Sequence, residues 1–387
     1  MTELTVPGAP ASYDVTELAQ LPRLGGLFAK GLAGSASKRP KGAVRLPKLA
    51  YQVADVDTAG EVAHLAAYQR LLGEPSSEVL PAGFLHVLAF PLATAVMVRG
   101  DFPLPLLGMV HLRNTARVLR PVRLGDALTV RAWAQDARAH RRGVQVDLVA
   151  EVLVGGELAY QSVSTYLAKG FRAPDGAAPD AEAPREEWTA PLPTARWKLG
   201  AGTGRAYGAI SGDQNPIHTS SLGAKAFGFP RAIAHGMYTA ARALAEVGPA
   251  RRGETYEWTV EFFKPVLLPS TVDVAIRYAS EVSTSSTNGV GSTEGAGFVY
   301  EGWRSGKNTR HFRGTVTPSD HPRDPRSRAL VRTPALSRRS TAREVERASG
   351  QALYFAEEVG RTGRSTSSQR IARFGRKKPE CPIRLRP

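Results

Sequence analysis

The two halves of the chain follow the same order of residue patterns. In the first half, the proline-led apolar segment 81–96 precedes two strand-like segments that flank Arg120-Pro121-Val122. In the second half, segment 230–245 precedes two similar segments that flank Lys264-Pro265-Val266. Self-similarity of this kind predicts duplication of one structural unit. It limits the fold to two copies of one supersecondary arrangement.

Each unit is predicted to have an α+β fold. In the first unit, segment 60–73 has apolar residues at helical spacing, and segment 84–98 is a buried helix that contains Pro91. Alternating residues predict strands over 49–57, 109–120, 126–137, 143–154 and 157–170, the last two joined by Gly155-Gly156. A long buried helix followed by antiparallel strands suggests a sheet that wraps around the helix.

Composition divides the chain into five parts. The predicted parts are a flexible lead-in over 1–45, a first unit over 46–170, a linker over 171–187, a second unit over 188–318 and a basic tail over 319–387. Within the lead-in, a short helix is expected over 15–21, because Asp14 is a plausible cap and Pro22 would end it. The linker is rich in Ala, Pro, Asp and Glu, and segment 280–297 is rich in Ser, Thr and Gly, as in a loop.

Charge and cysteine content exclude several classes of protein. The net charge is +16, but residues 321–387 hold 17 Lys and Arg against 6 Asp and Glu, so the basic character belongs mostly to a tail predicted to be disordered. The tail has no zinc-ligand or RNA-binding pattern, which argues against nucleic acid as a partner. The single Cys381 fits a reducing compartment, and neither a signal peptide nor a membrane span is expected. These features predict a cytoplasmic protein.

The motif SGDQNPIH over 211–218 holds the candidate chemistry. Asp213 and His218 stand five residues apart, and Pro216 between them biases Asn215 towards extended geometry. A carboxylate and an imidazole on one stiff loop are general acid–base groups that can orient a water. Further along, His235-Gly236 opens a helical run that Gly248 ends. The free N–H groups at the start of that helix would stabilise negative charge on a substrate carbonyl.

The run from Tyr207 to His218, with His235-Gly236, resembles the signature of the MaoC-like, R-specific (type 2) enoyl-CoA hydratases. That resemblance implies two tandem hotdog units, each a long helix wrapped by an antiparallel sheet, which together form a pseudo-dimer. It also implies reversible addition of water to a trans-2-enoyl-CoA, giving the (R)-3-hydroxyacyl thioester.

The resemblance also assigns roles to residues of the motif. Asp213 and His218 are the expected acid–base pair, and the Gly236 N–H is expected to stabilise the enolate-like oxygen. The residues expected to shape the loop are Ser211, Gly212, Asn215 and Pro216. Contacts with the substrate are expected from Tyr207, His235, Met237 and Lys264.

The first half lacks this motif. Gly73 and Glu74 align with Gly212 and Asp213, but neither Asn-Pro nor a histidine follows them. Aligning the apolar helices pairs His86 with His235, and we interpret His86 as a packed or capping residue. The first half is therefore expected to keep the fold without the reaction and, as in double-hotdog relatives, to shape the acyl channel.

Neither a metal nor a cofactor is expected. The chain has no His-x-x-x-His or Cys-x-x-Cys spacing and no dinucleotide fingerprint, so coenzyme A would enter only as part of the substrate. The alternative carrier is an acyl carrier protein. Lys225, Arg231 and Lys264 are candidates for contact with either anionic carrier, although a solvated surface role suits them equally. A monomer and a homodimer are both compatible with a duplicated chain.

Two other functions stay open at this level. One is the reverse reaction, dehydration of 3-hydroxyacyl groups on a carrier protein during fatty-acid or polyketide synthesis. The other is a non-catalytic protein that binds acyl thioesters. The intact pair of Asp213 and His218 favours catalysis over binding alone.

Overall fold

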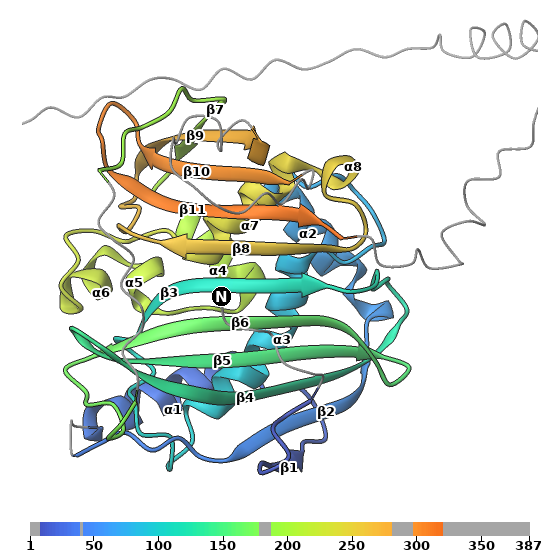
Figure 1. Cartoon of the computed structure of the whole chain (residues 1–387), viewed down its shortest axis with the longest axis vertical. Helices are drawn as coiled ribbons and strands as arrows, with labels where there is room; N and C mark the ends of the chain where they lie inside the picture. Colours follow the sequence, from blue (N-terminus) through green and yellow to red (C-terminus); the bar gives the residue numbers. More distant parts are fainter. Residues whose placement is uncertain (1–7, 39–41, 178–186, 281–296, 320–387) are drawn as a thin grey trace, which may run out of the picture. The chain divides into compact units, whose positions relative to one another are not determined.

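A single sheet of eleven strands runs through the computed structural model of the protein (Figure 1). The structure describes residues 8–38, 42–177, 187–280 and 297–319. The strand order is β1-β2-β4-β5-β6-β3-β8-β11-β10-β9-β7, and every neighbouring pair except β1 and β2 is antiparallel. The strands are β1 (Asp14–Glu17), β2 (Leu49–Asp57), β3 (Val110–Val118), β4 (Ala127–His140), β5 (Gly143–Val154), β6 (Glu157–Lys169), β7 (Ala195–Leu199), β8 (Tyr256–Phe262), β9 (Ser270–Tyr278), β10 (Phe298–Arg304) and β11 (Arg310–Pro318).

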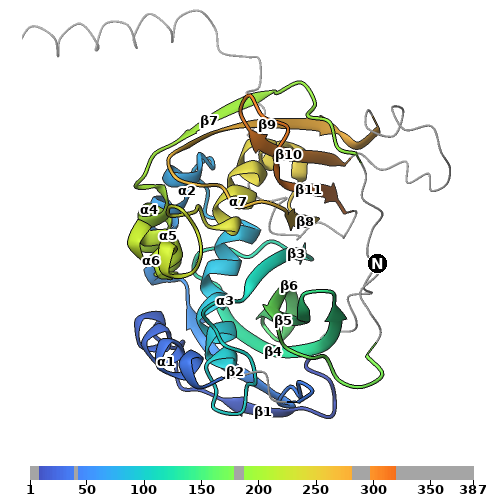
Figure 2. The ribbon, with the colours of Figure 1, turned by 90° about the vertical axis from the view of Figure 1, so that its left-hand side faces the viewer.

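The sheet curves around two central helices, α3 (Ala82–Met97) and α7 (Gly236–Val247), as Figure 2 shows. Almost all of α3 is buried, which explains why its sequence is apolar on every side. The other helices are α1 (Leu24–Ser37), the 3-10 helix η1 (Ala59–Glu61), α2 (Val62–Leu72), α4 (Thr203–Ser211), α5 (Pro216–Thr219), α6 (Ser221–Ala226) and α8 (Pro249–Arg252). None of the helices in the described ranges has the length and apolar character that crossing a membrane requires.

The strand order shows the predicted duplication. From its outer strand to its inner one, the first unit reads β2-β4-β5-β6-β3 and the second reads β7-β9-β10-β11-β8, so each strand has a counterpart at the same place. The two inner strands, β3 and β8, pair antiparallel with Thr115 opposite Thr259, and this pairing makes the two sheets continuous. Each unit is therefore a helix wrapped by an antiparallel sheet, which is the hotdog fold predicted from the sequence.

Equivalent hydrogen bonds fix how the two units correspond. The backbone N–H of Leu80 donates to the carbonyl of Val122 (2.8 Å), and the N–H of Ala234 donates to the carbonyl of Val266 (2.9 Å). Both bonds join the segment before the central helix to the segment before β4 or β9. This correspondence confirms the alignment of Arg120-Pro121-Val122 with Lys264-Pro265-Val266.

The same correspondence shows that the pairing of His86 with His235 is wrong. Pro81 directly follows Leu80 and precedes α3, just as His235 follows Ala234 and precedes α7. Pro81 is therefore the counterpart of His235, whereas His86 lies inside α3. Because α3 is apolar on every side, its sequence pattern does not distinguish one alignment register from another. His86 needs an explanation of its own.

The start of the chain differs from the prediction. The short helix expected over 15–21 is wrong, because residues 14–17 form strand β1, whose side chains are all exposed. The N–H of Leu18 donates to the carbonyl of Gln52 (2.8 Å), so the edge of β2 supplies hydrogen bonds that a two-turn helix would have to make alone. The lead-in predicted to be flexible also contains α1, where Gly31 lies against Leu106.

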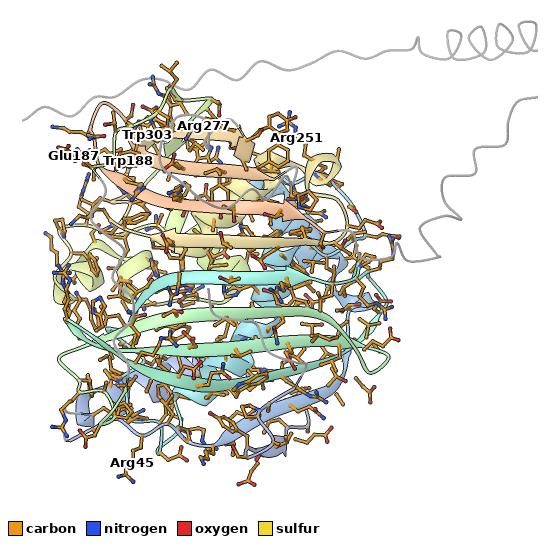
Figure 3. All side chains as sticks on the ribbon, in the orientation of Figure 1. Arg45, Glu187, Trp188, Arg251, Arg277 and Trp303 are labelled. Carbon is orange, nitrogen blue, oxygen red and sulfur yellow. The ribbon has the colours of Figure 1, made fainter. Side chains whose placement is uncertain are left out.

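The second unit begins with Trp188 packed on the strands of its sheet (Figure 3). The ring of Trp188 lies 6.1 Å from that of Trp303, and its Nε1 donates to Glu301 Oε1 (3.0 Å). Arg277 donates to the other oxygen of Glu301 (2.7 Å), so the carboxylate joins the two side chains. Most of the predicted linker, nearly all of the loop predicted over 280–297 and the tail from residue 320 lie outside the described residues, and the bounds of these parts stay predictions.

Candidate active site

The loop that holds Asp213 begins where α4 ends. Gly212 has a φ of 71°, a left-handed conformation that glycine adopts without strain, and it turns the chain out of the helix. The hydroxyl of Ser211 accepts a hydrogen bond from the N–H of Asp213 (3.2 Å). The same conformation recurs at Gly73 (φ 73°), directly after α2. These contacts give Ser211 and Gly212 a part in the turn.

Asn215 and Pro216 connect the loop to α5. Asn215 Oδ1 accepts from the N–H of Ile217 (3.3 Å) and caps the helix, while Pro216 occupies a first-turn position where no N–H is needed. The N–H of Asn215 donates to Asp213 Oδ1 (3.1 Å). The Asn215 side chain thus caps the helix that contains His218, and the Asn215 backbone N–H orients the carboxylate of Asp213. Pro216 begins a short helix where the sequence predicted only a stiff loop.

Two glycines of α4 let the loop lie directly on that helix. A Cβ atom at Gly204 would overlap the backbone carbonyl of His218, and one at Gly208 would lie 2.8 Å from the carbonyl oxygen of Asp213. Both positions therefore require the absence of a side chain. Asp213 and His218 therefore lie against the same surface of α4.

The hydrogen bonds of the two histidines decide which nitrogens carry protons. His218 Nδ1 lies 3.0 Å from the carbonyl oxygen of Ile233, which can only accept, so Nδ1 is protonated and Nε2 can accept a proton. By the same reasoning, His235 Nε2 is protonated and donates to the backbone carbonyl of Asp213 (3.0 Å). The two rings stack with their centroids 3.8 Å apart. Asp213 Oδ2 lies 3.7 Å from His235 Nε2.

Burial moves the pKa values of the acid and of His218 towards each other. It raises the pKa of Asp213, against the opposing effects of His218 and of the hydrogen bond from Asn215. It lowers the pKa of His218, against the opposing effect of Asp213. Burial, followed by the proximity of His218, holds the pKa of His235 well below its usual value. A smaller difference between the two pKa values makes proton movement through a shared water easier.

The N-terminus of α7 lies beside this pair. His235 is the residue before the helix, and the first N–H groups of any helix have no partner within it. A Cβ atom at Gly236 would lie 2.8 Å from the ring of Phe262. Packing against Phe262 is therefore one structural reason for a glycine at position 236. The approach of a substrate carbonyl to Gly236 stays a prediction.

The other predicted substrate contacts have different surroundings. Tyr207 is 2% exposed, and its ring lies 5.1 Å from that of His235, so it packs against the site. Met237 is 6% exposed and belongs to the core. Lys264 is exposed, and its backbone carbonyl accepts a hydrogen bond from His311. Lys225 and Arg231 are also exposed. The substrate roles of these residues stay predictions.

Two residues of the first unit approach the site, although no sequence motif indicated either of them. Tyr166 lies in β6, and its pKa is raised by burial and then by the charge of Asp213. Its ring stacks on that of His111 in β3 (4.5 Å), which lies 5.2 Å from the ring of Phe262. Only the pairing of β3 with β8 brings these side chains to the motif. The duplication was the one signal that predicted such a pairing.

The first unit offers no matching acid–base pair. Glu74 follows Gly73 as Asp213 follows Gly212, but both oxygens of Glu74 accept hydrogen bonds from Arg252 (2.5 and 3.2 Å). The two side chains are 5% and 7% exposed. Both oxygens of the buried Glu74 carboxylate are thus engaged by a guanidinium, which distinguishes Glu74 from Asp213.

Three side chains could hold a metal ion, because Asp213, His218 and His235 offer ligand atoms within 4.8 Å of one another. Each histidine has one nitrogen engaged with a backbone carbonyl, which leaves one nitrogen on each ring. Asp213 and His218, two of these three residues, are also the pair expected to hold the water. That the site works without a metal stays a prediction.

An aspartate and a histidine thus lie beside the start of the central helix in the second of two hotdog units. The family model described as MaoC like domain matches residues 188–294. The chain is 37% identical over 214 residues to 3-hydroxyacyl-thioester dehydratase X of Mycobacterium tuberculosis (strain ATCC 25618 / H37Rv), covering 55% of this chain and 75% of that protein. This chain belongs to the MaoC-like dehydratase family, whose members are hydro-lyases.

Solved structures agree with this assignment. The crystal structure of HtdX of Mycobacterium tuberculosis is 31% identical in sequence with a TM-score of 0.57, and the match covers 69% of this chain and 98% of that one. A structure described as a MaoC-like dehydratase is 17% identical with a TM-score of 0.51, over 70% of this chain and 97% of that one. The second likeness concerns the fold alone.

Proposed function

We propose that the protein catalyses the reversible hydration of trans-2-enoyl-CoA to (R)-3-hydroxyacyl-CoA, with Asp213 and His218 as the acid–base pair. The observation that supports this most strongly is the geometry of the loop. The Asn215 N–H orients the carboxylate of Asp213, and the Ile233 carbonyl holds His218 so that Nε2 is free. The preference for the (R) product is what the resemblance of the motif implies.

The pair holds one water and moves its protons. One member accepts a proton as the water oxygen bonds to the β-carbon of the enoyl group, and the pair returns a proton to the α-carbon. The net change is the addition of one water, and the same groups catalyse the reverse reaction. Positioned acid–base groups contribute about 10²–10⁴-fold in rate.

The thioester oxygen gathers negative charge between the two proton movements. The N–H of Gly236 and the positive end of α7 would stabilise that charge. The loss of one such donor typically costs about 10²–10³-fold in rate. No group other than the coenzyme A of the substrate is assigned a role in these steps.

The second candidate function is dehydration of a 3-hydroxyacyl thioester on a carrier protein. The name of the Mycobacterium tuberculosis relative, a 3-hydroxyacyl-thioester dehydratase, favours that direction. The exposed Lys225, Arg231 and Lys264 suit either anionic carrier. A protein that only binds acyl thioesters is disfavoured, because its acid–base loop would have no use.

A comparison of carriers separates these functions. The absorbance of the enoyl thioester is followed in both directions, with the same acyl group on coenzyme A and on an acyl carrier protein. A higher kcat/KM on coenzyme A supports the hydratase, and a higher value on the carrier protein supports the alternative. Binding of both thioesters by folded protein without any turnover would refute both enzymatic proposals.

A further inference from the structure

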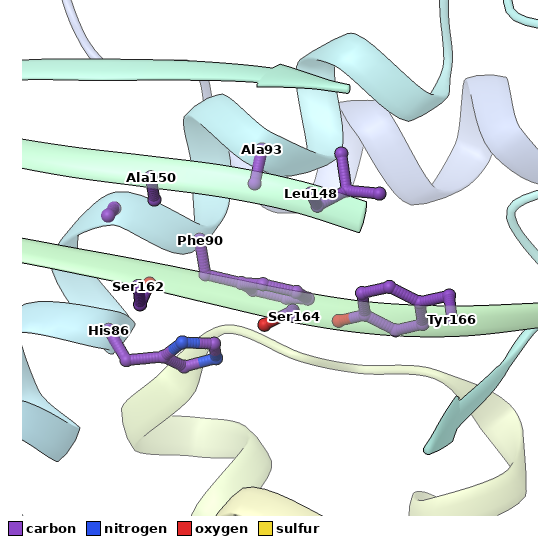
Figure 4. Close-up of a pocket in the computed structure, with 9 residues that line it drawn as sticks. His86, Phe90, Ala93, Leu148, Ala150, Ser162, Ser164 and Tyr166 are labelled. Carbon is purple, nitrogen blue, oxygen red and sulfur yellow. The ribbon is translucent and has the colours of Figure 1, made fainter. Parts of the chain in front are cut away.

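A pocket lies in the first unit between α3 and the strands β5 and β6 (Figure 4). Phe90, three alanines and Leu148 form its apolar lining. The rest of the lining is polar and comprises His86, Ser162, Ser164 and Tyr166. Figure 4 shows His86 and Phe90 projecting from α3 towards Ser164 and Tyr166 on β6.

This pocket adjoins the catalytic loop of the second unit. Tyr166 lines the pocket, and it is close enough to Asp213 for the carboxylate to raise its pKa, after the larger effect of burial. The stacked ring of His111 connects Tyr166 to Phe262, which packs against Gly236. An acyl chain that left the reacting carbons towards the first unit would run along Tyr166 towards this pocket.

His86 is the unusual residue of the lining. Its ring lies 5.9 Å from that of Phe90, and neither ring nitrogen has a hydrogen-bond partner among the residues that the structure describes. Burial lowers the pKa of His86 to about 4, so the ring is neutral at physiological pH and presents one donor and one acceptor. Because Pro81 is the counterpart of His235, His86 is not a remnant of a second catalytic site.

The polar character continues along β6. Ser164 Oγ accepts a hydrogen bond from the fully buried Asn114 (2.9 Å), and the Ser164 side chain also interacts with Tyr166. A purely alkyl chain in the pocket would exclude water and leave the donor and the acceptor of His86 unpaired, which is unfavourable. An oxygen on the chain would pair with them. A site that binds such an oxygen discriminates strongly against chains that lack it.

We propose that His86 determines specificity by hydrogen-bonding an oxygen, in a hydroxyl or carbonyl group, on the tail of the acyl substrate. This inference rests on the proposed hydratase or dehydratase function and names the chemical class of its acyl group. Ser164 and Tyr166 lie on the opposite wall, where their side chains interact with each other.

The test compares trans-2-enoyl-CoA substrates of equal length, with and without a hydroxyl group on the tail. Wild-type protein is expected to prefer the hydroxylated chain by about tenfold or more in kcat/KM. His86→Leu should lower kcat/KM for the hydroxylated chain, raise it for the plain chain and so reverse the preference. His86→Gln, which keeps a donor and an acceptor, should retain the preference in part.

Phe90→Leu is the matched control, because it changes the same pocket without removing a hydrogen-bonding group. It should alter both substrates alike and leave their ratio unchanged. Crotonyl-CoA, whose tail is a single methyl group, should be turned over equally by wild type and His86→Leu. That substrate also shows that the His86 variants are folded and active.

Two results would overturn the inference. One is equal kcat/KM for both chains with wild-type protein, and the other is a ratio that His86→Leu leaves unchanged. Both leave turnover of crotonyl-CoA intact, whereas failure of the proposed function abolishes turnover of every thioester. If no thioester is turned over, calorimetry measures the binding of the two chains to wild type and to His86→Leu. Equal affinities would then refute the role of His86.

Discussion

Removing Glu74 from its buried ion pair is expected to destabilise the protein strongly while leaving the catalytic loop intact. Glu74 accepts two hydrogen bonds from Arg252, and the side chains are only 5% and 7% exposed. The guanidinium also lies 5.5 Å from the ring centroid of Tyr256 and 3.4 Å from the carbonyl of Leu244. Glu74→Ala would leave this charge buried without a counterion.

The burial of both partners sets the size of the effect. Breaking a buried pair by removing one partner typically costs about 3–5 kcal/mol, whereas an exposed pair contributes about 0–1 kcal/mol. Because both side chains are almost fully covered, we expect the larger value for Glu74→Ala. For a folded unit of this size, that loss lowers Tm by on the order of 10 °C.

Urea unfolding of wild type, Glu74→Ala and the double variant Glu74→Leu/Arg252→Met measures this effect. The double variant removes both charges and should recover most of the stability, because apolar replacement of a buried pair is often neutral or favourable. The free energy of unfolding of Glu74→Ala is decisive. If it lies within about 1 kcal/mol of wild type, the pair behaves as an exposed one and the reasoning is wrong.

Three further predictions concern the loop. Gly204→Ala places a methyl group against the carbonyl of His218 and should lower both activity and Tm, whereas Gly25→Ala, at an open position in α1, should leave activity unchanged and should not lower Tm. Burial raises the pKa of Asp213 above its ordinary 3.8. Wild type therefore loses stability as pH rises from 3.8 to this raised pKa. Asp213→Asn should therefore unfold at a higher temperature than wild type at neutral pH, with a difference that shrinks towards pH 3.8; an equal difference at every pH would contradict this. Overnight treatment with a chelator should leave turnover unchanged, and a loss that zinc restores would instead assign a metal to Asp213, His218 and His235.

Local patterns predicted the elements whose ends are set by local chemistry. Gly155-Gly156 joins β5 to β6, and Gly248 ends α7, as expected from their turn and cap preferences. Strand β1 was missed because its hydrogen bonds come from β2, far along the chain. No local propensity reports such a partner.

In the site, too, the part determined by local sequence was predicted and the part supplied by distant strands was not. The loop around Asp213 and His218 is contiguous in the sequence, so its motif was visible. Tyr166 and His111 approach it only through the pairing of β3 with β8. The register of His86 could not be predicted, because nearly every residue of α3 is buried and its apolar pattern has no preferred face. The hydrogen bonds before α3 and α7 supplied the register that the pattern lacked.

Turnover of trans-2-enoyl-CoA by wild type, Asp213→Asn and His218→Ala, with chiral analysis of the product, tests the central claim most directly. Wild type should give the (R)-3-hydroxyacyl thioester, and each variant should lose about 10²–10⁴-fold in kcat while remaining folded. Circular dichroism at the assay temperature serves as the control for folding. Unchanged turnover in either variant, or formation of the (S) product by wild type, would contradict the assignment of Asp213 and His218 as the acid–base pair of an R-specific hydratase.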